Sequence, residues 1–314
     1  MQTNFVRQNI FPTVAAFIWG TAFVAQSVAA DVVPPFTFTA ARAAVAVIFL
    51  LALSLGLRAY RRYKGRESGG GAVYWRNLLL GGLCCGLCMA IATNLQQKGL
   101  ETTAAGKAGF ITALYIVIVP LFGIFLHKKV GKMVWLSVAI AVIGLYFLCL
   151  NESLSITPDD FLILLCAFCF AGQILFIDYF AQKVDGVELS CAQFAVTAVF
   201  SAVGMFFTET PDVAMLQAAA GSILYVGVFS SGVAYTLQIL AQKGSNPTTV
   251  SLLLSLEAPF ATLAGAIILS DQLSGREYLG CFLMLIAVVL AQLPEVKVRE
   301  RVGALCGVKL DSKS

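Results

Sequence analysis

Residues 96–100 read QQKGL, and residues 241–245 read AQKGS. Each copy of this short polar stretch stands between two long apolar segments. When the chain is aligned with itself at an offset of 145 residues, QQKGLETTAAG falls on AQKGSNPTTVS, and the apolar segments that follow also align. The shared Gln-Lys-Gly sequence therefore marks the same short turn in two related halves of the chain.

The earlier apolar segments align at an offset of 151 residues. AFIWG at 16–20 falls on AFCFA at 167–171, and FTAARAAVAV at 38–47 falls on LSCAQFAVTAV at 189–199 with one slip. The additional residues of the first half lie in the basic loop 58–76. Five apolar segments in the first half are thus repeated as five in the second.

The composition indicates a membrane protein. Hydrophobic residues make up 59% of the chain and charged residues 12%, whereas soluble proteins carry about 25% charged residues. A helix needs roughly 20 apolar residues to cross the bilayer, and it satisfies its own backbone there. We therefore predict an all-α integral membrane protein with ten transmembrane helices, at about 11–30, 36–57, 77–97, 103–126, 133–150, 158–179, 189–208, 214–240, 246–269 and 275–293.

The distribution of positive charge predicts the orientation of these helices. With the N-terminus in the cytoplasm, 17 of the 21 Lys and Arg residues lie in cytoplasmic segments, and Lys98 and Arg276 lie in outer loops. Both termini are then cytoplasmic. Because five is an odd number of spans, the second half must enter the membrane from the opposite side.

The chain is thus predicted to contain two inverted five-helix repeats, residues 1–152 and 153–294, and a basic cytoplasmic tail, 295–314. Inverted repeats are typical of secondary transporters, because exchanging the conformations of the halves opens a central site to the other side. A duplication retained only for stability, as in some channels or membrane enzymes, is the alternative.

Motifs of enzymes and cofactor proteins are missing from the sequence. It contains no nucleotide-binding loop, HExxH motif, serine-nucleophile elbow or carboxylate cluster. The nine cysteines lie mostly in apolar segments, and the CxxC pairs at 85–88 and 166–169 stand beside no second pair of ligands. We expect no catalytic residues, metal site, cofactor or nucleic-acid partner.

Three charged residues inside apolar segments are candidates for a role in the membrane: Arg42, Lys107 and Glu257. Glu257 is expected near the bilayer midplane, where a carboxylate either lines a hydrated cavity and couples transport to protons or pairs with another helix. The neighbouring Pro259 weakens the local helix. Arg42 is compatible with snorkelling, a structural pairing or an anionic ligand, and Lys107 with snorkelling to the outer face or contact with a substrate carboxylate.

Uncharged polar and aromatic side chains are the other candidates for lining a cavity. These are Trp19, Asn94, Gln96, Gln97, Thr112, Tyr115, Gln173, Tyr235 and Gln238. Tyr235 and Gln238 are three residues apart and share a helix face. Thr112 aligns with Glu257, so both are expected near the pseudo-twofold axis. Interhelical hydrogen bonds are the alternative role for each of these residues.

Several short motifs occur in a characteristic order between residues 11 and 293. They are Trp19-Gly20-Thr21 with Phe23, Phe36-Thr37-Phe38, Arg42, Gly106-x-x-Gly109-Phe110-Ile111-Thr112, Pro120, Glu257-x-Pro259, Gly265 and Asp271. In this order the chain resembles the drug/metabolite transporter superfamily, and within it the ten-helix EamA-type transporters. The resemblance implies that a glutamate commonly stands where this chain has Asp271, and the first-half equivalent here is His127-Lys128-Lys129.

The resemblance implies a secondary active transporter, an exporter of small polar or amphipathic metabolites such as amino acids, working by alternating access. Its implied location is the cytoplasmic membrane of a bacterium, and a proton is the candidate coupling ion. A carrier for a phosphorylated or lipid-linked sugar is one alternative, and it would need two or more basic residues in its cavity. A non-transporting membrane protein is another.

Overall fold

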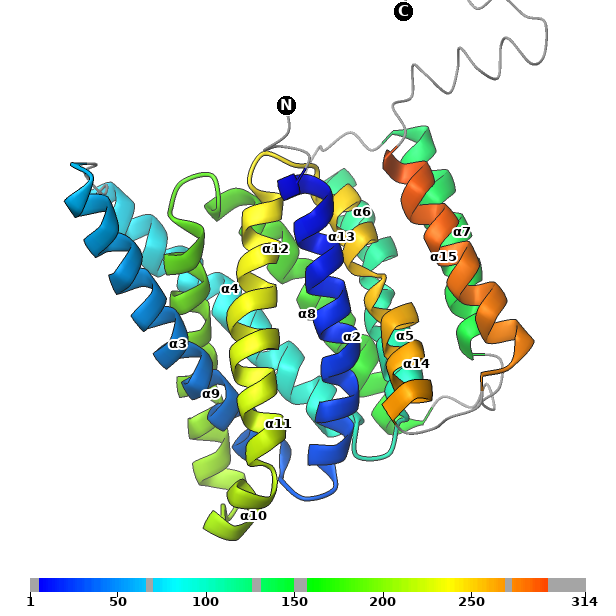
Figure 1. Ribbon diagram of the computed structural model, residues 1–314, viewed down its shortest axis with the longest axis horizontal. Coiled ribbons are helices and arrows are strands. Elements are labelled where there is room, and N and C mark those ends of the chain that lie inside the picture. The colour runs from blue at the N-terminus through cyan, green and yellow to red at the C-terminus, as the bar shows by residue number, and fades with distance from the viewer. Residues whose placement is uncertain (1–5, 66–69, 126–130, 150–156, 269–272, 293–314) are drawn as a thin grey trace, which may run out of the picture.

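The computed structural model describes residues 6–65, 70–125, 131–149, 157–268 and 273–292, and most of these are helical (Figure 1). His127-Lys128-Lys129, Asp271 and the tail 295–314, which the sequence analysis singled out, lie outside the described residues.

The helices follow one another in two series. The first half contains η1 (Val6–Ile10), α2 (Phe11–Ala30), α3 (Pro35–Tyr63), α4 (Ala72–Gly99), α5 (Ala105–Ala113), α6 (Tyr115–Phe125) and α7 (Lys132–Cys149). The second half contains α8 (Pro158–Phe180), α9 (Gly186–Thr208), α10 (Val213–Ala218), α11 (Ala220–Tyr225), η2 (Val226–Ala234), α12 (Tyr235–Gln242), α13 (Pro247–Leu254), α14 (Glu257–Ile268) and α15 (Gly275–Gln292). Here η1 and η2 are π-helices.

Eight helical segments among the described residues are long and apolar enough to cross a membrane. They are Val6–Ala30, Pro35–Tyr63, Ala72–Gly99, Ala105–Phe125, Pro158–Phe180, Gly186–Thr208, Ala220–Gln242 and Pro247–Ile268. The apolar helix Lys132–Leu148 is shorter. The prediction of an all-α, multi-spanning membrane protein is confirmed, and eight of its ten expected spans meet this criterion.

Local sequence fixes where several helices begin. Pro158 stands in the first turn of α8, where its missing N–H costs nothing. Thr157 and Asp160 form a reciprocal capping box at the same end. Asp185 caps α9, and its side chain accepts hydrogen bonds from two backbone N–H groups. Asp160, in the first turn of α8, and Asp185, just beyond the end of α8, also form ion pairs with Lys107 and Arg61 of the first half.

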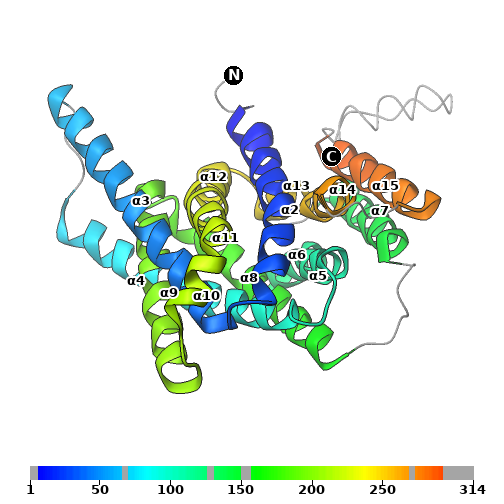
Figure 2. The same cartoon turned by 60° about the horizontal axis from the view of Figure 1, so that its bottom comes forward.

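The two halves are interleaved rather than placed side by side as separate bodies (Figures 1 and 2). From the first half, α3 packs along α9, and α4 packs along both α8 and α9. The helix α2 contacts α14, η2 and α12 and lies near the middle of the bundle in Figure 1. The pair α7 and α15 packs closely together at one edge of the bundle.

Glycines allow the closest contact between α7 and α15. A Cβ atom at Gly280 would lie 2.6 Å from the backbone oxygen of Gly144, and one at Gly144 would lie 3.0 Å from the oxygen of Gly280. Small residues permit such backbone contact between membrane helices. Packing therefore holds this pair together at a site where a larger side chain has no room.

We expect Gly280→Leu to force α7 and α15 apart and to lower the unfolding temperature of the purified protein. Overpacking of this kind typically costs about 1–3 kcal/mol. Gly221→Leu is the matched control, because a Cβ atom at Gly221 meets nothing within 4 Å. Equal unfolding temperatures for the two variants in the same detergent would contradict the tight contact.

Candidate functional site

A central chamber lies where α2, α3, α4, α8, η2, α12 and the broken fourth and ninth apolar segments meet. It is lined by Trp19, Phe23, Gln26, Arg42, Gln96, Thr112, Tyr115, Phe170, Ile174, Ser230, Tyr235, Gln238, Leu254 and Glu257. About 440 Å³ of empty space lies among these residues, and this figure includes space open to solvent.

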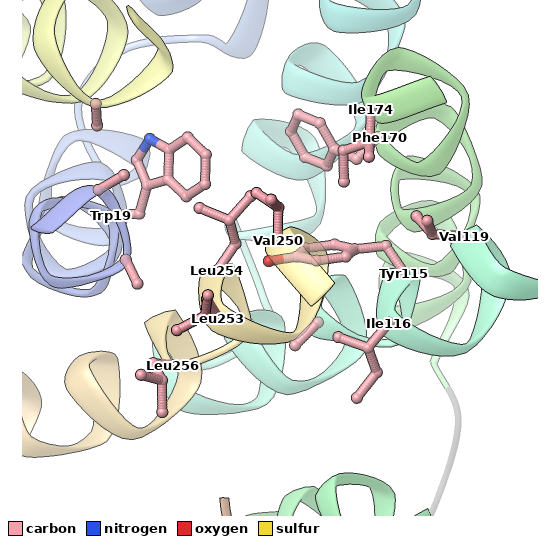
Figure 3. Packing of buried hydrophobic residues seen from close by; sticks show 14 of the residues in the cluster. Trp19, Tyr115, Ile116, Val119, Phe170, Ile174, Val250, Leu253, Leu254 and Leu256 are labelled. Carbon is pink, nitrogen blue, oxygen red and sulfur yellow. The ribbon is translucent and has the colours of Figure 1, made fainter. Parts of the chain in front are cut away.

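Aromatic rings form part of the chamber wall. Figure 3 shows Trp19, Tyr115 and Phe170 around one space, together with Ile174 and Leu254. These residues come from α2, α6, α8 and α13. The rings provide apolar area, and Trp and Tyr also carry a polar atom that seeks a partner when buried.

Two of the segments that line the chamber are interrupted at it. The fourth apolar segment breaks at Leu114, between α5 and α6, and the ninth breaks at Ser255 and Leu256, between α13 and α14. Pro259 explains the second break, because it cannot donate a hydrogen bond to the carbonyl of Ser255, four residues earlier. Tyr115 and Glu257 begin the two half-helices that follow the breaks.

Glu257 faces the chamber as a buried carboxylate. Its side chain is 4% exposed, and within the described part of the chain its Oε1 atom has no hydrogen-bond partner. Tyr115 is its polar neighbour. The Tyr115 hydroxyl is the group beside Glu257 that can donate a hydrogen bond to this carboxylate. Since an unpaired buried carboxylate is costly, this pair is suited to receive a proton or a ligand.

Arg42 reaches the chamber from α3. Its Nη1 atom donates to Oε1 of Gln26 (2.6 Å), and its guanidinium lies 5.7 Å from the ring centroid of Phe38. Among the residues that the structure describes, Nη2 has no acceptor. Arg42 is only 4% exposed, so it does not snorkel as one interpretation allowed. It forms no ion pair with Glu257.

Tyr235 connects the chamber to the surrounding helices. Its ring centroid lies 4.6 Å from that of Trp19 and 5.4 Å from that of Phe194. Within the described residues, Nε1 of Trp19 has no acceptor. The aromatic stack therefore holds an indole N–H in the chamber wall without satisfying it.

A short chain of buried amides leads away from the chamber. Nε2 of Gln238 donates to Oε1 of Gln173 (3.3 Å), and Nε2 of Gln173 donates to Oε1 of Gln193 (3.2 Å). These two hydrogen bonds join α12, α8 and α9. Oε1 of Gln238, which lines the chamber, keeps no donor among the described residues.

The structure brings together most of the sequence candidates but leaves Asn94, Gln97, Lys107 and Gln173, and the two prolines, outside the lining of the chamber. Lining it are Trp19, Arg42, Gln96, Thr112, Tyr115, Tyr235, Gln238 and Glu257. Gln97 and Gln173 are buried behind its wall, and Asn94 lines a separate groove together with Lys98 and Glu101. The helix-breaking residues Pro120 and Pro259 are buried in α6 and α14.

Sequence reasoning did not single out six of the lining residues for the chamber: Phe23, Gln26, Phe170, Ile174, Ser230 and Leu254. The repeat contained a signal for one of them. At the offset of 151, Phe170 is the counterpart of the candidate Trp19. Ser230 lies in the π-helix η2, which the apolar pattern did not indicate.

Ion pairs join the two halves near both ends of α8. At its beginning, Nζ of Lys107 lies 2.9 Å from Oδ2 of Asp160. Beyond its other end, Arg58 lies 2.8 Å from Glu188, which also accepts a hydrogen bond from Tyr74 (2.7 Å). Lys107 therefore has a carboxylate partner within the protein, away from the chamber.

The chain was compared with protein-family models and with known proteins. The model of the EamA-like transporter family matches twice, over residues 9–150 and 158–293. An uncharacterized transporter of Archaeoglobus fulgidus is 29% identical over 279 residues, which is 88% of this chain and 83% of that protein. An uncharacterized transporter of Synechocystis is 28% identical, covering 94% of this chain and 93% of that protein.

Two further similarities are more distant. A chloroplastic WAT1-related protein of Arabidopsis thaliana is 24% identical over 89% of this chain and 68% of its own length. A crystal structure matches 94% of this chain and 98% of its own chain with a TM-score of 0.72 and 19% identity. At that identity the likeness shows the fold alone.

Proposed function

Because the chain belongs to the EamA-like transporter family, we propose that it is a secondary active transporter that exports small polar or amphipathic metabolites, such as amino acids, by alternating access. The proposal includes ten membrane-crossing helices in two inverted repeats, residues 1–152 and 153–294, with both termini cytoplasmic. It places the protein in a cytoplasmic membrane. The bias of Lys and Arg toward one side supports this orientation.

One observation carries the proposal: several buried polar groups that lack partners in the described chain belong to side chains that line one chamber. Nε1 of Trp19, Nη2 of Arg42 and Oε1 of Gln238 have no partner there, and the Glu257 carboxylate has Tyr115 as its polar neighbour. An unsatisfied buried polar atom costs about 1–3 kcal/mol. Such a cluster is understandable if a ligand supplies the missing partners for part of the working cycle.

The unpartnered atoms define the ligand that would fit. Arg42 and Trp19 present N–H donors, which suit a carboxylate or another acceptor. Glu257 and Gln238 present acceptors, which suit an ammonium or hydroxyl group. The aromatic rings would hold an apolar part of the ligand. A small molecule with both donor and acceptor groups and little net charge satisfies the whole set.

A phosphorylated substrate fits this chamber less well. Phosphate sites usually gather two or more basic side chains. Lys107 pairs with Asp160, so Arg42 is the lining cation among the residues that the structure describes. We therefore favour a metabolite without a phosphate group.

The interrupted segments support alternating access. In many transporters, broken helices at the midplane present unpaired backbone groups to the substrate and allow one half to rock against the other. Here both breaks border the chamber, at Leu114 and at Ser255 with Leu256. The ion pairs at the two ends of α8 are contacts between the halves that a rocking motion would have to open in turn.

Metabolite loss from proteoliposomes tests the proposal. Vesicles loaded with a whole-cell metabolite extract are diluted, and the compounds that leave are profiled against protein-free vesicles. We expect one chemical class to leave only in the presence of the protein. If no compound leaves faster than from protein-free vesicles, with or without a proton gradient, small-metabolite transport by this chain is wrong.

We expect Trp19→Leu to weaken substrate binding about tenfold, because it removes both an aromatic wall and an unpartnered N–H donor. A lost hydrogen bond with the aromatic contact corresponds to about 1–2 kcal/mol. The expected sign is a higher apparent KM with a smaller change in maximal rate. Phe17→Leu is the control, since Phe17 also lies on α2 but is 54% exposed outside the chamber. Equal KM values for the two variants would show that Trp19 does not contact the substrate.

A further inference from the structure

The repeated Gln-Lys-Gly sequence performs the same task in both halves. Nε2 of Gln97 donates to the backbone oxygen of Gln26 (3.1 Å), and Nε2 of its counterpart Gln242 donates to the backbone oxygen of Ile174 (2.8 Å). Both glutamines are fully buried. In the described chain the Oε1 atom of each lacks a partner. Each glutamine thus clamps the third span of its half to the first span.

The offset of 151 residues between the first spans rests on the match of AFIWG at 16–20 with AFCFA at 167–171. At an offset of 151, Trp19 and Phe23 of α2 fall on Phe170 and Ile174 of α8. All four residues line the same chamber. The two helices therefore present corresponding positions to the centre of the protein.

By that correspondence the two clamps are not equivalent. The counterpart of Gln26 is Ile177, but Gln242 bonds to Ile174, three residues earlier. Three residues are almost one helical turn, or about 4.5 Å of rise. The clamp in the second half therefore holds its first span one turn away from the register that the first half has.

A second pair of contacts shows the same displacement. Arg42 and Gln193 are counterparts at the offset of 151. Arg42 donates to the side chain of Gln26, whereas Gln193 accepts from the side chain of Gln173, four residues before Ile177. The contacts with the second span and those with the third span therefore agree. Relative to the second and third spans of its half, α8 sits about one helical turn away from the position that α2 has relative to the second and third spans of its own half.

We infer that the transport cycle exchanges these two registers. In the opposite-facing state, the amide of Gln97 donates to the carbonyl of Phe23 and the amide of Gln242 donates to the carbonyl of Ile177. Gln97 and Gln242 are then positioning residues that hold α2 and α8 at either of two registers. This inference rests on the proposed function, because it requires that the two halves exchange conformations.

The physical reason for two discrete registers is the spacing of helix carbonyls. Residues three apart lie on nearly the same face of a helix, so a slide of one turn brings a new carbonyl to the same amide. Halfway along the slide a buried amide has no acceptor, and leaving it unsatisfied is unfavourable. One-turn ratchets of this kind are a known form of switching between packed helices.

The slide would reach the substrate site directly. Trp19 and Phe23 travel with α2, and Phe170 and Ile174 travel with α8, so both chamber walls shift in each cycle. The bond between Arg42 and the Gln26 side chain belongs to the present register. In the opposite state this hydrogen bond is broken and the guanidinium of Arg42 is released. The change of register is thereby linked to substrate release.

Distances between pairs of spin labels test the inference. One pair joins Ile10 and Lys98, and its counterpart in the second half joins Phe161 and Lys243. The carbonyl that accepts the glutamine amide lies 16 residues beyond Ile10 in the first half and 13 residues beyond Phe161 in the second. These separations correspond to about 24 Å and 20 Å of helix rise. The two pairs should therefore differ in length, and the difference should reverse when the state changes.

Labels would be placed in a chain whose nine cysteines are replaced by alanine, in lipid nanodiscs over a range of pH and in vesicles with a proton gradient of either sign. We expect two populations in each pair, about 5 Å apart. A condition that lengthens one pair should shorten the other. Ile10 with Val28, at the two ends of one helical segment, is the control and should keep a single distance.

The glutamines themselves supply a second readout. With Gln242→Leu, the two sharp populations of the pair 161/243 should merge into one broad distribution, because no amide selects a carbonyl. The pair 10/98 in the same sample retains its amide and reports whether the protein is folded. A merely structural role for Gln242 predicts unchanged peak positions and widths.

The outcomes separate this inference from the proposed function. If each pair keeps one distance in every condition while metabolites still leave the vesicles, the exchange of registers is wrong and the transporter proposal stands. If the distances exchange but no metabolite moves, the slide is real and the transporter proposal fails. Peaks that remain sharp in Gln242→Leu would also overturn the role of the clamps.

Discussion

Replacing Glu257 by glutamine is expected to abolish uphill, gradient-driven transport while leaving downhill exchange of substrate across the membrane. Glu257 is buried in the chamber with one unpartnered oxygen among the described residues. A carboxylate in that position can gain or lose a proton at the site where the ligand binds, whereas an amide of the same shape cannot. We expect the accumulation ratio across the membrane to fall to unity.

The measurement compares accumulation of the identified metabolite with and without an imposed proton gradient. The wild-type protein should respond to the gradient, and the variant should give the same downhill rate at every pH. Glu277→Gln is the control, because the Glu277 carboxylate bonds to Ser274 at the start of α15, away from the chamber. Full gradient-driven accumulation by Glu257→Gln would rule out proton coupling at this residue.

Replacing Arg42 by methionine is expected to lower the apparent affinity for substrate about 10- to 100-fold. Methionine keeps a long, flexible side chain but removes the donor that faces the chamber. A hydrogen bond to a charged group contributes about 1.5–3 kcal/mol, and every 1.4 kcal/mol corresponds to about a tenfold change in affinity. The same change leaves Oε1 of Gln26 without the hydrogen bond that it accepts from Arg42 in the present register.

Folding and binding can be separated for Arg42. Arg42→Lys keeps the charge without the planar fork, so we expect it to recover part of the affinity. Unfolding temperatures of both variants report any loss of stability from the contacts with Gln26 and Phe38. A methionine variant that is folded and binds substrate with unchanged affinity would show that Arg42 serves only to pack α3 against α2.

The repeat was the most informative feature of the sequence, and the structure explains why Gln-Lys-Gly occurs twice. Gln97 and Gln242 each donate to a backbone oxygen in the first span of their own half. The sequence could not indicate their registers, because an alignment relates residues to residues and says nothing of how far one helix has slid along another. A displacement of one turn changes no residue and no apolar pattern.

Individual cavity residues were harder to predict than the spans. Successive residues of a helix point about 100° apart, so Gln96 faces the chamber whereas Gln97 is buried against α2. In an apolar bundle both faces are hydrophobic, and the pattern gives no sign of which one is central. Charge was a partial guide, because lipid does not accommodate it: Glu257 and Arg42 line the chamber, whereas Lys107 pairs with Asp160 away from it.

Backbone irregularities followed the sequence in part. Pro259 indicated a weakened helix, and the ninth segment does break just before it. The break at Leu114 and the π-helix η2 had no comparable signal. In η2, Gly227 and Gly232 lie where a Cβ atom would come within 2.7 Å of Val45 and Phe49 of α3. Close packing between helices therefore accompanies the irregular geometry, and such packing depends on the three-dimensional partner.

Protection of a cysteine in the chamber tests the central claim most directly. Ser230→Cys is introduced into a cysteine-free chain, and its rate of modification by a membrane-permeant maleimide is measured with and without the metabolite that efflux profiling identifies. Ser230 lines the chamber, and Ser222→Cys, in the same apolar segment but away from the chamber, is the control. We predict that substrate slows modification at position 230 and not at position 222. Equal modification rates with and without saturating substrate at position 230 would contradict the claim that the metabolite passes through this chamber.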